Sequence, residues 1–321
     1  MNSQDSIPDP SLSASGKTLI VVAGPTAIGK TAMAIRLAQE FATEIISADS
    51  RQFFREMNIG TAVPSDEELA LVKHHFIGQR SVHDDYNASK FETEALECLK
   101  KLFGQHRVVI MAGGSGMYID AVCNGMDSLP DPDEELRISL KLALSEKGPD
   151  ELRHQLRALD PETYHNIDIS NPVRVIRALE ICLLTGRKVS ELRTAIPQKR
   201  DFNIIKIALN RPRNELFETI NQRVDRMMEA GLYEEAKSLY TLRSLNSLNT
   251  VGYRELFACI DGAMSYDLAV EKIKTNTRRY AKRQLTWFRR DKAYHWFKPE
   301  QTDAIIATIN QLLYLQAEAQ T

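Results

Sequence analysis

Cysteine is scarce in this chain, with four residues among 321, and they are widely scattered: Cys98, Cys123, Cys182 and Cys259. Their spacing excludes a zinc ribbon or a CxxC site, and it is typical of proteins from a reducing compartment. Long apolar runs, internal repeats and the pattern of a signal peptide are also missing. We therefore expect a cytoplasmic protein with no membrane partner, whose polar residues 1–16 form a disordered leader.

The chain also lacks an excess of either charge, since 41 Lys and Arg residues face 43 Asp and Glu residues. Bulk charge therefore predicts no nucleic-acid partner, and any basic surface must be local. One such region is 271–292, which holds nine basic residues and two acidic ones, with aromatic residues between them. This combination suits RNA phosphates and bases. A solvated helix whose aromatic residues pack against the core would produce the same pattern.

Apolar runs that alternate with helical patterns indicate an α/β fold. Buried strands are expected at 18–23, 44–47, 108–112 and 202–210, with a last short strand at 294–297. Strands that alternate with helices favour a parallel sheet with helices on both faces. We expect the core to comprise residues 17–127 and 201–321, interrupted by a helical insertion at 128–200.

Capping signals suggest where several helices lie. Ser65 with Glu68, and Ser89 with Glu92, have the spacing of capping boxes. The first box predicts a helix over 66–74, which would place the pair His74-His75 at a helix end. Within the insertion we expect helices at 133–146, 149–158, 172–184 and 188–193.

A glycine-bracketed loop, GPTAIGKT at residues 24–31, joins the first expected strand to the first helix. The pattern G-x-x-x-x-G-K-[ST] in this setting is that of a phosphate-binding loop. Backbone amides and the helix N-terminus would hold phosphate oxygens. Lys30 would reach the terminal oxygens, and the hydroxyl of Thr31 would bind Mg²⁺.

The strand at 108–112 does not end in the carboxylate that usually holds Mg²⁺ in ATP-hydrolysing proteins with this loop. It ends in GGSG at 113–116, which predicts either a bulky group close to the backbone or a tight turn. A carboxylate, Asp49, does follow the second strand, at the sheet edge where open α/β sheets place ligands. Its position suits a general base, a metal ligand or a helix cap.

Seven segments occur in order along the chain: GPTAIGKT, ISADSRQFFREMNIGTA, AGGSGMY, NPVRVIRALEI, QRVDRMMEAGLYEE, VGYRE and RRYAKRQLTWFRR. Together they resemble the bacterial tRNA dimethylallyltransferases, the tRNA isopentenyltransferase family. The resemblance implies transfer of a dimethylallyl group from dimethylallyl diphosphate to N6 of an adenosine. That adenosine lies directly 3′ of the anticodon, in tRNAs that read codons beginning with U. It also implies a P-loop nucleotide-kinase-like core, an insertion that binds the anticodon stem-loop, and Mg²⁺ as the metal.

The same resemblance assigns roles to individual residues. Asp49 matches the general base, while Thr26 and Arg223 match residues that position the diphosphate and its reacting carbon. The diphosphate would also contact the whole loop: Gly24, Pro25, Thr26, Ala27, Ile28, Gly29, Lys30 and Thr31. Positions that match tRNA contacts are Asp49, Ser50, Arg51, Gln52, Ser115, Val173, Arg174, Val175, Ile176 and Arg177. Looser tRNA candidates are Gly252, Tyr253, Arg254, Lys282, Arg283, Gln284, Trp287 and Arg290.

Two positions depart from the family pattern: many relatives have Arg at the place of Thr219, and an acid near the place of Gly78. Two other functions remain open at this point. A nucleotide or small-metabolite kinase would share the loop and the fold, and a non-catalytic RNA-binding protein could keep a vestigial loop. We expect a monomer, because no large apolar face is left over.

Overall fold

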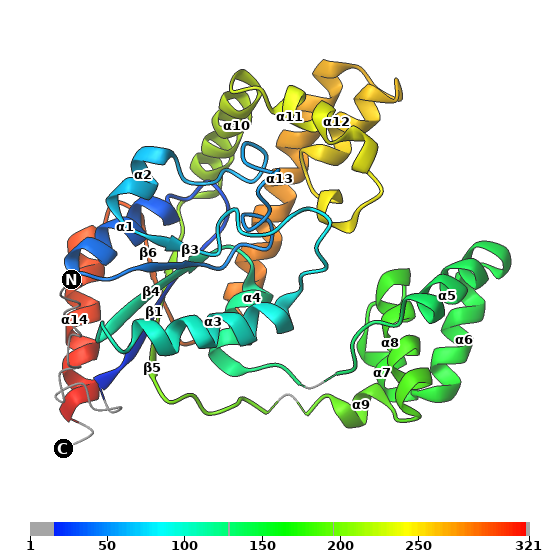
Figure 1. Ribbon diagram of the computed structural model, residues 1–321, viewed down its shortest axis with the longest axis horizontal. Helices are drawn as coiled ribbons and strands as arrows, with labels where there is room; N and C mark the ends of the chain where they lie inside the picture. The colour runs from blue at the N-terminus through cyan, green and yellow to red at the C-terminus, as the bar shows by residue number, and fades with distance from the viewer. Residues whose placement is uncertain (1–15, 128, 195, 319–321) are drawn as a thin grey trace, which may run out of the picture. The chain divides into compact units, whose positions relative to one another are not determined.

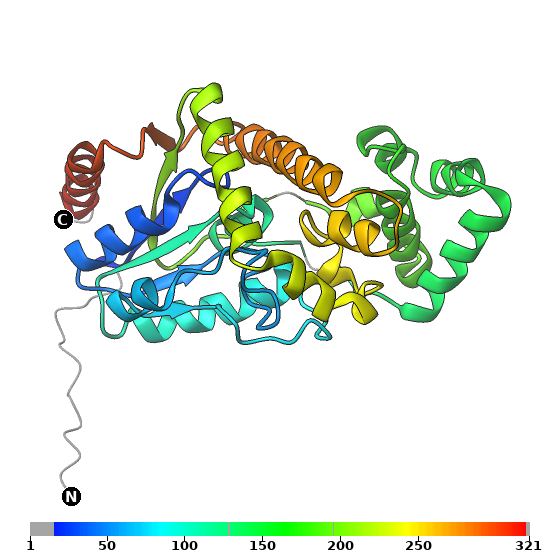
Figure 2. The same ribbon diagram turned by 90° about the horizontal axis from the view of Figure 1, so that it is seen from above.

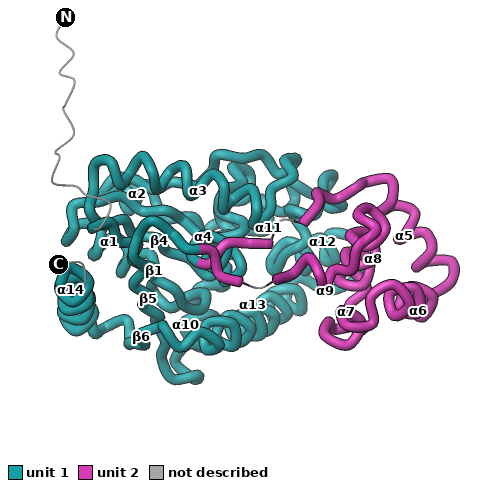
Figure 3. Tube along the Cα trace, turned by 90° about the horizontal axis from the view of Figure 1, so that it is seen from below, with its two compact units in different colours: residues 1–123, 199–321 teal, residues 124–198 magenta. Residues whose placement is uncertain are grey.

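The computed structural model describes residues 16–127, 129–194 and 196–318. It divides the chain into two compact units, of which unit 1 comprises 1–123 with 199–321 and unit 2 comprises 124–198 (Figure 3). We expected an insertion over 128–200, and the unit boundary falls where the backbone amide of Gln198 donates to the carbonyl of Asn124 at 2.6 Å. The expected leader lies outside the described residues, apart from Gly16.

Unit 1 is built on a parallel sheet with the strand order β3-β2-β4-β1-β5-β6 (Figure 1). The strands are β1 (Thr18–Ala23), β2 (Ile45–Ser47), β3 (His74–His75), β4 (Val108–Gly113), β5 (Asn203–Leu209) and β6 (Tyr294–Phe297). Every strand pair is parallel. The fold is therefore α/β, as predicted, and β1 is buried along its whole length because it lies between β4 and β5.

Helices cover both faces of this sheet (Figures 1 and 2). On one face, α1 (Lys30–Glu40) and α14 (Thr302–Glu318) pack in one apolar cluster with the strand residues Ile20, Val22 and Ile207. The other face is covered by α3 (Ala88–Leu102) and α4 (Gly116–Asn124). The remaining helices of unit 1 are α2 (Asp66–Leu71), α10 (Arg213–Glu229), α11 (Leu232–Ser238), η2 (Tyr240–Leu242), η3 (Asn246–Leu248), α12 (Tyr253–Ile260) and α13 (Tyr266–Phe288).

Unit 2 is helical. Its helices are α5 (Glu134–Lys147), α6 (Pro149–Leu159), α7 (Pro161–Asn166), α8 (Pro172–Thr185) and α9 (Val189–Leu192). They share an apolar core of their own, which includes Leu152, Leu156 and Leu179. The short helix α7 was not predicted; it is capped by Asp160, whose carboxylate accepts from the Thr163 amide at 2.9 Å.

Two expectations about local structure are wrong. His74 and His75 form strand β3 rather than a helix end, because α2 stops at Leu71 and the Lys73 carbonyl accepts from the Ile45 amide at 3.0 Å. The start of α3 is capped by Asn87 and not by Ser89: the Asn87 side chain accepts from the amides of Ser89 and Lys90. None of the helices in the described ranges combines the length and hydropathy needed to span a bilayer.

Candidate active site

The phosphate loop follows β1 and leads into α1, as the sequence predicts. Gly29 precedes the helix with φ of 98°, a left-handed conformation that glycine adopts without strain. Gly24 also has a positive φ, of 152°, and a Cβ atom there would in addition lie 2.8 Å from the Leu209 carbonyl oxygen of β5. The loop backbone is therefore held tightly against the neighbouring strand.

Lys30 lies inside this loop, where its Nζ donates to the Pro25 carbonyl at 2.8 Å. Burial, together with the nearby positive charge of Arg223, lowers the pKa of Lys30 to about 7, while Asp49 acts in the opposite direction. Arg223, from α10, also donates to the Thr26 hydroxyl at 3.4 Å. The structure thus brings the loop, Asp49 and Arg223 together, although they lie far apart in sequence.

Two pockets meet at Asp49. The larger one, here called the phosphate-loop pocket, measures about 1180 Å³ and is lined by residues 26–32, Asp49, Arg223 and Tyr280, among others. The smaller one, here called the arginine pocket, measures about 330 Å³. Its basic lining residues are Arg51, Arg223, Arg254 and Arg283. The residues that line both pockets are Thr26, Asp49, Thr61, Ala62, Arg223, Met227 and Tyr280.

The segment after β2 fixes Asp49 at this junction. The Asp49 carboxylate accepts from the Arg51 amide at 2.9 Å, and the Ser50 amide donates to the Ser115 hydroxyl at 2.9 Å. Gln52 accepts from the Ser47 hydroxyl at 2.9 Å and donates to the Ala62 carbonyl at 3.0 Å. Asp49 thus caps a turn through one oxygen while it also lines both pockets, so the capping and functional interpretations of this residue are compatible.

The glycines at 113–116 make room for parts of the protein itself. A Cβ on Gly113 would lie 2.1 Å from the Ala48 carbonyl oxygen, one on Gly114 would lie 2.3 Å from Gln284 Nε2, and one on Gly116 would lie 2.3 Å from the Trp287 ring. The bulky group that the glycines predicted is therefore α13 together with the segment after β2.

Gln284 of α13 joins the phosphate loop to this glycine turn. Its side-chain oxygen accepts from the Thr26 amide at 2.9 Å, and its side-chain nitrogen donates to the Gly114 carbonyl at 2.8 Å. Only 6% of Gln284 is exposed. Both polar groups of its side chain are therefore engaged within the protein, and its expected tRNA contact stays a prediction.

Comparison with known proteins places this arrangement in a family. A protein-family profile described as IPP transferase matches residues 52–291. The chain belongs to this family. It is 50% identical over 301 residues to tRNA dimethylallyltransferase 1 of Bacteroides fragilis, a match that covers 94% of this chain and 98% of the relative.

Other relatives, among curated proteins and solved structures, are similar to this chain over most of its length. The chain is 51% identical over 280 residues to tRNA dimethylallyltransferase of Christiangramia forsetii, covering 87% of this chain and 93% of that one. Among solved structures, the full-length tRNA isopentenylpyrophosphate transferase of Bacillus halodurans matches with a TM-score of 0.71 and 34% identity, covering 95% and 99%. A eukaryotic dimethylallyltransferase acting on tRNA matches with a TM-score of 0.71 and 27% identity, covering 84% and 69%.

The tRNA positions that the IPP transferase resemblance suggested in unit 1 divide into three groups. Several line the arginine pocket: Asp49, Ser50, Arg51, Gly252, Arg254 and Arg283. Tyr253 does not, because it is fully buried and its hydroxyl donates to Glu235 at 2.6 Å. Lys282 lies one residue from Arg283 but lines a different cavity, since adjacent residues of a helix point in different directions.

The last group lies near the end of α13. The Trp287 indole donates to Asp120 at 2.7 Å and packs beside Gly116, and the Arg290 guanidinium lies 5.4 Å from the Trp287 ring centre. Both side chains keep exposed surface. Their expected tRNA contacts therefore stay predictions.

In unit 2, the expected tRNA segment 173–177 has an exposed side and a buried side. Val173 and Arg174 are exposed, whereas Val175 and Ile176 belong to the core of this unit. The Arg177 guanidinium donates to the buried Glu180 at 2.8 Å and to the Pro130 carbonyl. Direct contact with RNA is therefore open to the side chains of Val173 and Arg174, and not to those of Val175 and Ile176.

Tyr280 is a site residue that sequence reasoning did not single out. It lines both pockets, and burial with the nearby Asp49 raises its pKa to about 12, although a hydrogen bond with Ser115 opposes this shift. One helical turn separates it from Gln284, so the spacing along α13 could have indicated that both face the site.

Proposed function

We propose that this chain transfers a dimethylallyl group from dimethylallyl diphosphate to N6 of the adenosine 3′-adjacent to the anticodon, in tRNAs that read codons beginning with U. The observation that carries the proposal is the meeting of a phosphate-loop pocket and an arginine pocket at one carboxylate, Asp49. The names of the relatives, including tRNA dimethylallyltransferase 1 of Bacteroides fragilis, support the same reaction.

The phosphate-loop pocket suits the prenyl donor. Its loop amides, Lys30 and Arg223 would hold the diphosphate and stabilise the negative charge that grows on it as the C1–O bond breaks. Thr26, which accepts from Arg223, would help to position the diphosphate and its reacting carbon. The site therefore provides electrostatic help to a leaving group and needs no hydrolysis of ATP.

Magnesium fits this pocket as an ion carried by the diphosphate. The Thr31 hydroxyl lines the pocket next to Lys30, and the described residues contain no cluster of three His, Cys, Asp or Glu that could hold a metal alone. We propose that Thr31 would bind Mg²⁺ together with diphosphate oxygens, where the ion would neutralise part of their charge.

The arginine pocket suits a nucleotide extruded from RNA. Arg51, Arg254 and Arg283 supply positive charge around it, and Arg283 lies 5.7 Å from the ring centre of Tyr280. A loop base costs little to extrude, because it is only partly stacked. We propose that the adenine enters from this side and brings its N6 to Asp49.

In this reaction Asp49 accepts the proton that N6 loses. The N6 nitrogen attacks C1 of the prenyl group, the C1–O bond breaks, and diphosphate leaves with the electron pair. The N6 proton passes to the Asp49 carboxylate, a contribution of about 10²–10⁴-fold to the rate. The Asp49 oxygen that caps the Arg51 amide keeps the carboxylate oriented during this transfer.

We propose that the macromolecular partner is the anticodon stem-loop of tRNA, contacted by the arginine pocket and by exposed residues of unit 2 such as Arg174. We also propose that the enzyme acts as a monomer in the cytoplasm.

A double-label assay tests this function. The protein is incubated with Mg²⁺, an unmodified anticodon stem-loop, and either prenyl-labelled dimethylallyl diphosphate or ATP labelled in its terminal phosphate. We expect prenyl label to reach the RNA with release of one diphosphate per transfer, and no label from ATP. Transfer of the ATP label to any acceptor, without prenylation, would identify a kinase and overturn the proposal. RNA binding with neither label transferred would indicate a non-catalytic binding protein.

A further inference from the structure

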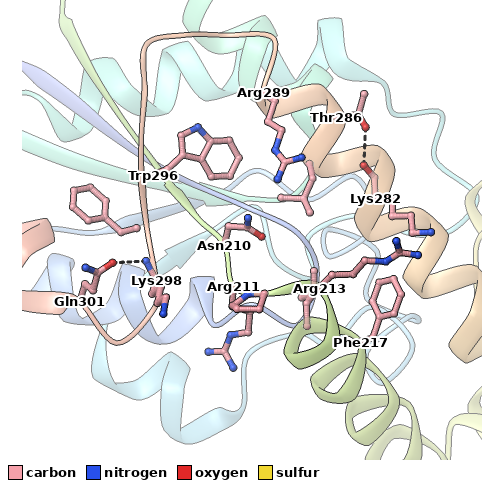
Figure 4. A pocket seen from close by; sticks show the side chains of 14 residues that line it. Asn210, Arg211, Arg213, Phe217, Lys282, Thr286, Arg289, Trp296, Lys298 and Gln301 are labelled. Atoms are coloured by element: carbon pink, nitrogen blue, oxygen red, sulfur yellow. Dashed lines mark hydrogen bonds between the residues drawn. The ribbon is translucent and has the colours of Figure 1, made fainter.

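A third cavity, of about 860 Å³, lies apart from the site described above (Figure 4). We call it the Trp296 pocket. It is lined by Asn210, Arg211, Pro212, Arg213, Leu216, Phe217, Lys282, Leu285, Thr286, Arg289, Trp296, Phe297, Lys298 and Gln301. These residues come from residues 210–212 and the start of α10, from one side of α13 and its C-cap Arg289, and from the end of β6 with the residues that follow it. The pocket shares no lining residue with the phosphate-loop pocket or the arginine pocket.

The charged side chains that line this pocket are all cationic. Five cationic side chains line it and no carboxylate does: Arg211, Arg213, Lys282, Arg289 and Lys298. Arg211 pairs with Glu300 at 2.7 Å, but in the described part of the chain the other four form no ion pair. Like charges gathered without counter-charges repel one another, so the arrangement favours an anionic ligand.

The charge concentrates around one aromatic ring. Arg213, Lys282 and Arg278 lie 5.0, 5.6 and 5.9 Å from the ring centre of Phe217. Arg278 donates to the Asn221 side chain at 2.6 Å, whereas the cationic ends of Arg213 and Lys282 lie close to each other at one side of the pocket (Figure 4). Guanidinium and ammonium groups in such an arrangement are well suited to phosphate oxygens.

The pocket also offers features that a simple phosphate would not use. The Trp296 ring forms part of its wall (Figure 4), and side-chain amides of Asn210 and Gln301 lie among the cations. The Asn210 side-chain oxygen is buried and has no hydrogen-bond partner in the described residues, so it is free to accept from a ligand. A planar ring with N–H donors would stack on the indole and satisfy this oxygen.

We infer that the Trp296 pocket binds a free nucleoside phosphate, with its base against Trp296 and its phosphate among the cationic side chains of the lining. The volume suits a ligand of this size. The pocket adjoins the outer side of the phosphate loop, since a Cβ on Gly29 would lie 3.8 Å from Pro299, in the segment between Lys298 and Gln301. This inference goes beyond the proposed function, because it concerns a ligand that is neither prenyl donor nor tRNA.

Tryptophan fluorescence provides a direct test, because the chain has only two tryptophans, Trp287 and Trp296. A Trp287→Phe protein is titrated with AMP in the presence of Mg²⁺. We expect saturable quenching of Trp296, and equilibrium dialysis with labelled AMP should give the same affinity. No binding of AMP in dialysis would overturn the inference.

Charge-neutralising variants locate the bound nucleotide. In Arg213→Gln and Lys298→Gln we expect AMP affinity to fall, by up to about tenfold each, because each substitution removes a positive charge from the pocket lining. The matched control is Lys292→Gln, an exposed lysine outside the pocket lining, which should bind AMP normally. AMP affinity unchanged in both pocket variants would contradict the assignment.

An RNA arm separates the free nucleotide from a nucleotide of the tRNA strand. The same variants are titrated with the anticodon stem-loop, and we expect their affinity for it to stay within about twofold of the unaltered protein. A tenfold loss of stem-loop binding with normal AMP binding would assign the pocket to RNA and overturn the inference. Prenyl transfer is measured separately, so failure of this proposal is distinguishable from failure of the proposed function.

Discussion

At the scale of single residues, Lys30 links ligand binding to protonation. Burial and Arg223 hold its pKa at about 7, well below the ordinary value for lysine. A bound diphosphate favours the ammonium form and would therefore raise this pKa. Between pH 7 and the raised value, the complex holds more protons than the free protein. Diphosphate affinity should therefore fall as the pH rises through this window.

Calorimetry can measure this linkage. Inorganic diphosphate is titrated into the protein at pH 8 in buffers with different ionisation enthalpies, and we expect net proton uptake. Lys30→Arg is the matched variant, because arginine keeps its charge and does not titrate in this range. Its binding should show less proton uptake. Equal uptake by both proteins would mean that Lys30 is already charged in the free site.

At the scale of elements, α13 supports the phosphate loop through Gln284. Replacing it by leucine in Gln284→Leu keeps the bulk but leaves the Thr26 amide and the Gly114 carbonyl without partners. We expect the free energy of unfolding to fall by about 1–3 kcal/mol and the KM for the prenyl donor to rise. Denaturant unfolding and steady-state kinetics would measure the two effects.

The control for this variant is Gln222→Leu on α10. Among the described residues, the Gln222 side chain bonds only to Glu218 of its own helix, at 2.9 Å. Its replacement should change the free energy of unfolding by less than about 0.5 kcal/mol. If Gln284→Leu were as mild as this control, the bridge between α13 and the phosphate loop would not matter for either property.

The same element shows what sequence could and could not predict. The phosphate loop and the position of Asp49 follow from local patterns, because strand, glycine loop and helix are adjacent in sequence. The sequence does not predict which side of α13 faces which pocket. Lys282 and Arg283 are both basic, so composition alone cannot show that they line different cavities. Likewise, the glycines at 113–116 predicted a close neighbour, but only the fold identifies it as Gln284, Trp287 and the Ala48 backbone.

At the scale of the whole molecule, unit 2 has a buried ionic centre of its own. Glu180 is fully buried and accepts from Arg137 at 2.9 Å, from Arg177 at 2.8 Å and from the Asp133 amide at 2.9 Å. It thereby joins α8 to the start of α5. The sequence predicts helices here but not this ionic centre. Asp133 and Arg137 lie more than 40 residues from Glu180 in sequence, and Arg177 was expected to contact RNA.

Removing the Glu180 carboxylate should destabilise unit 2 and leave unit 1 unchanged. In Glu180→Ala we expect a loss of about 3–5 kcal/mol, because two arginines lose their buried counter-charge. Hydrogen exchange followed by mass spectrometry should show faster exchange in 124–198 and unchanged protection in the sheet of unit 1. Inorganic diphosphate should still bind.

The matched control is Glu191→Ala, since this carboxylate is 51% exposed and its partner Arg187 lies 4.0 Å away. We expect little change in exchange anywhere. Equal loss of protection in both units of Glu180→Ala would show instead that the chain unfolds as one cooperative body.

The most direct test of the account is single-turnover prenyl transfer by Asp49→Ala, started from a complex already saturated with donor and stem-loop. We expect both ligands to bind with unchanged affinity and the transfer rate to fall by about 10²–10⁴-fold. Asp85→Ala, which removes a 77% exposed carboxylate, should react at the normal rate. Transfer at the normal rate within the bound Asp49→Ala complex, or a loss explained by weaker binding alone, would contradict the account.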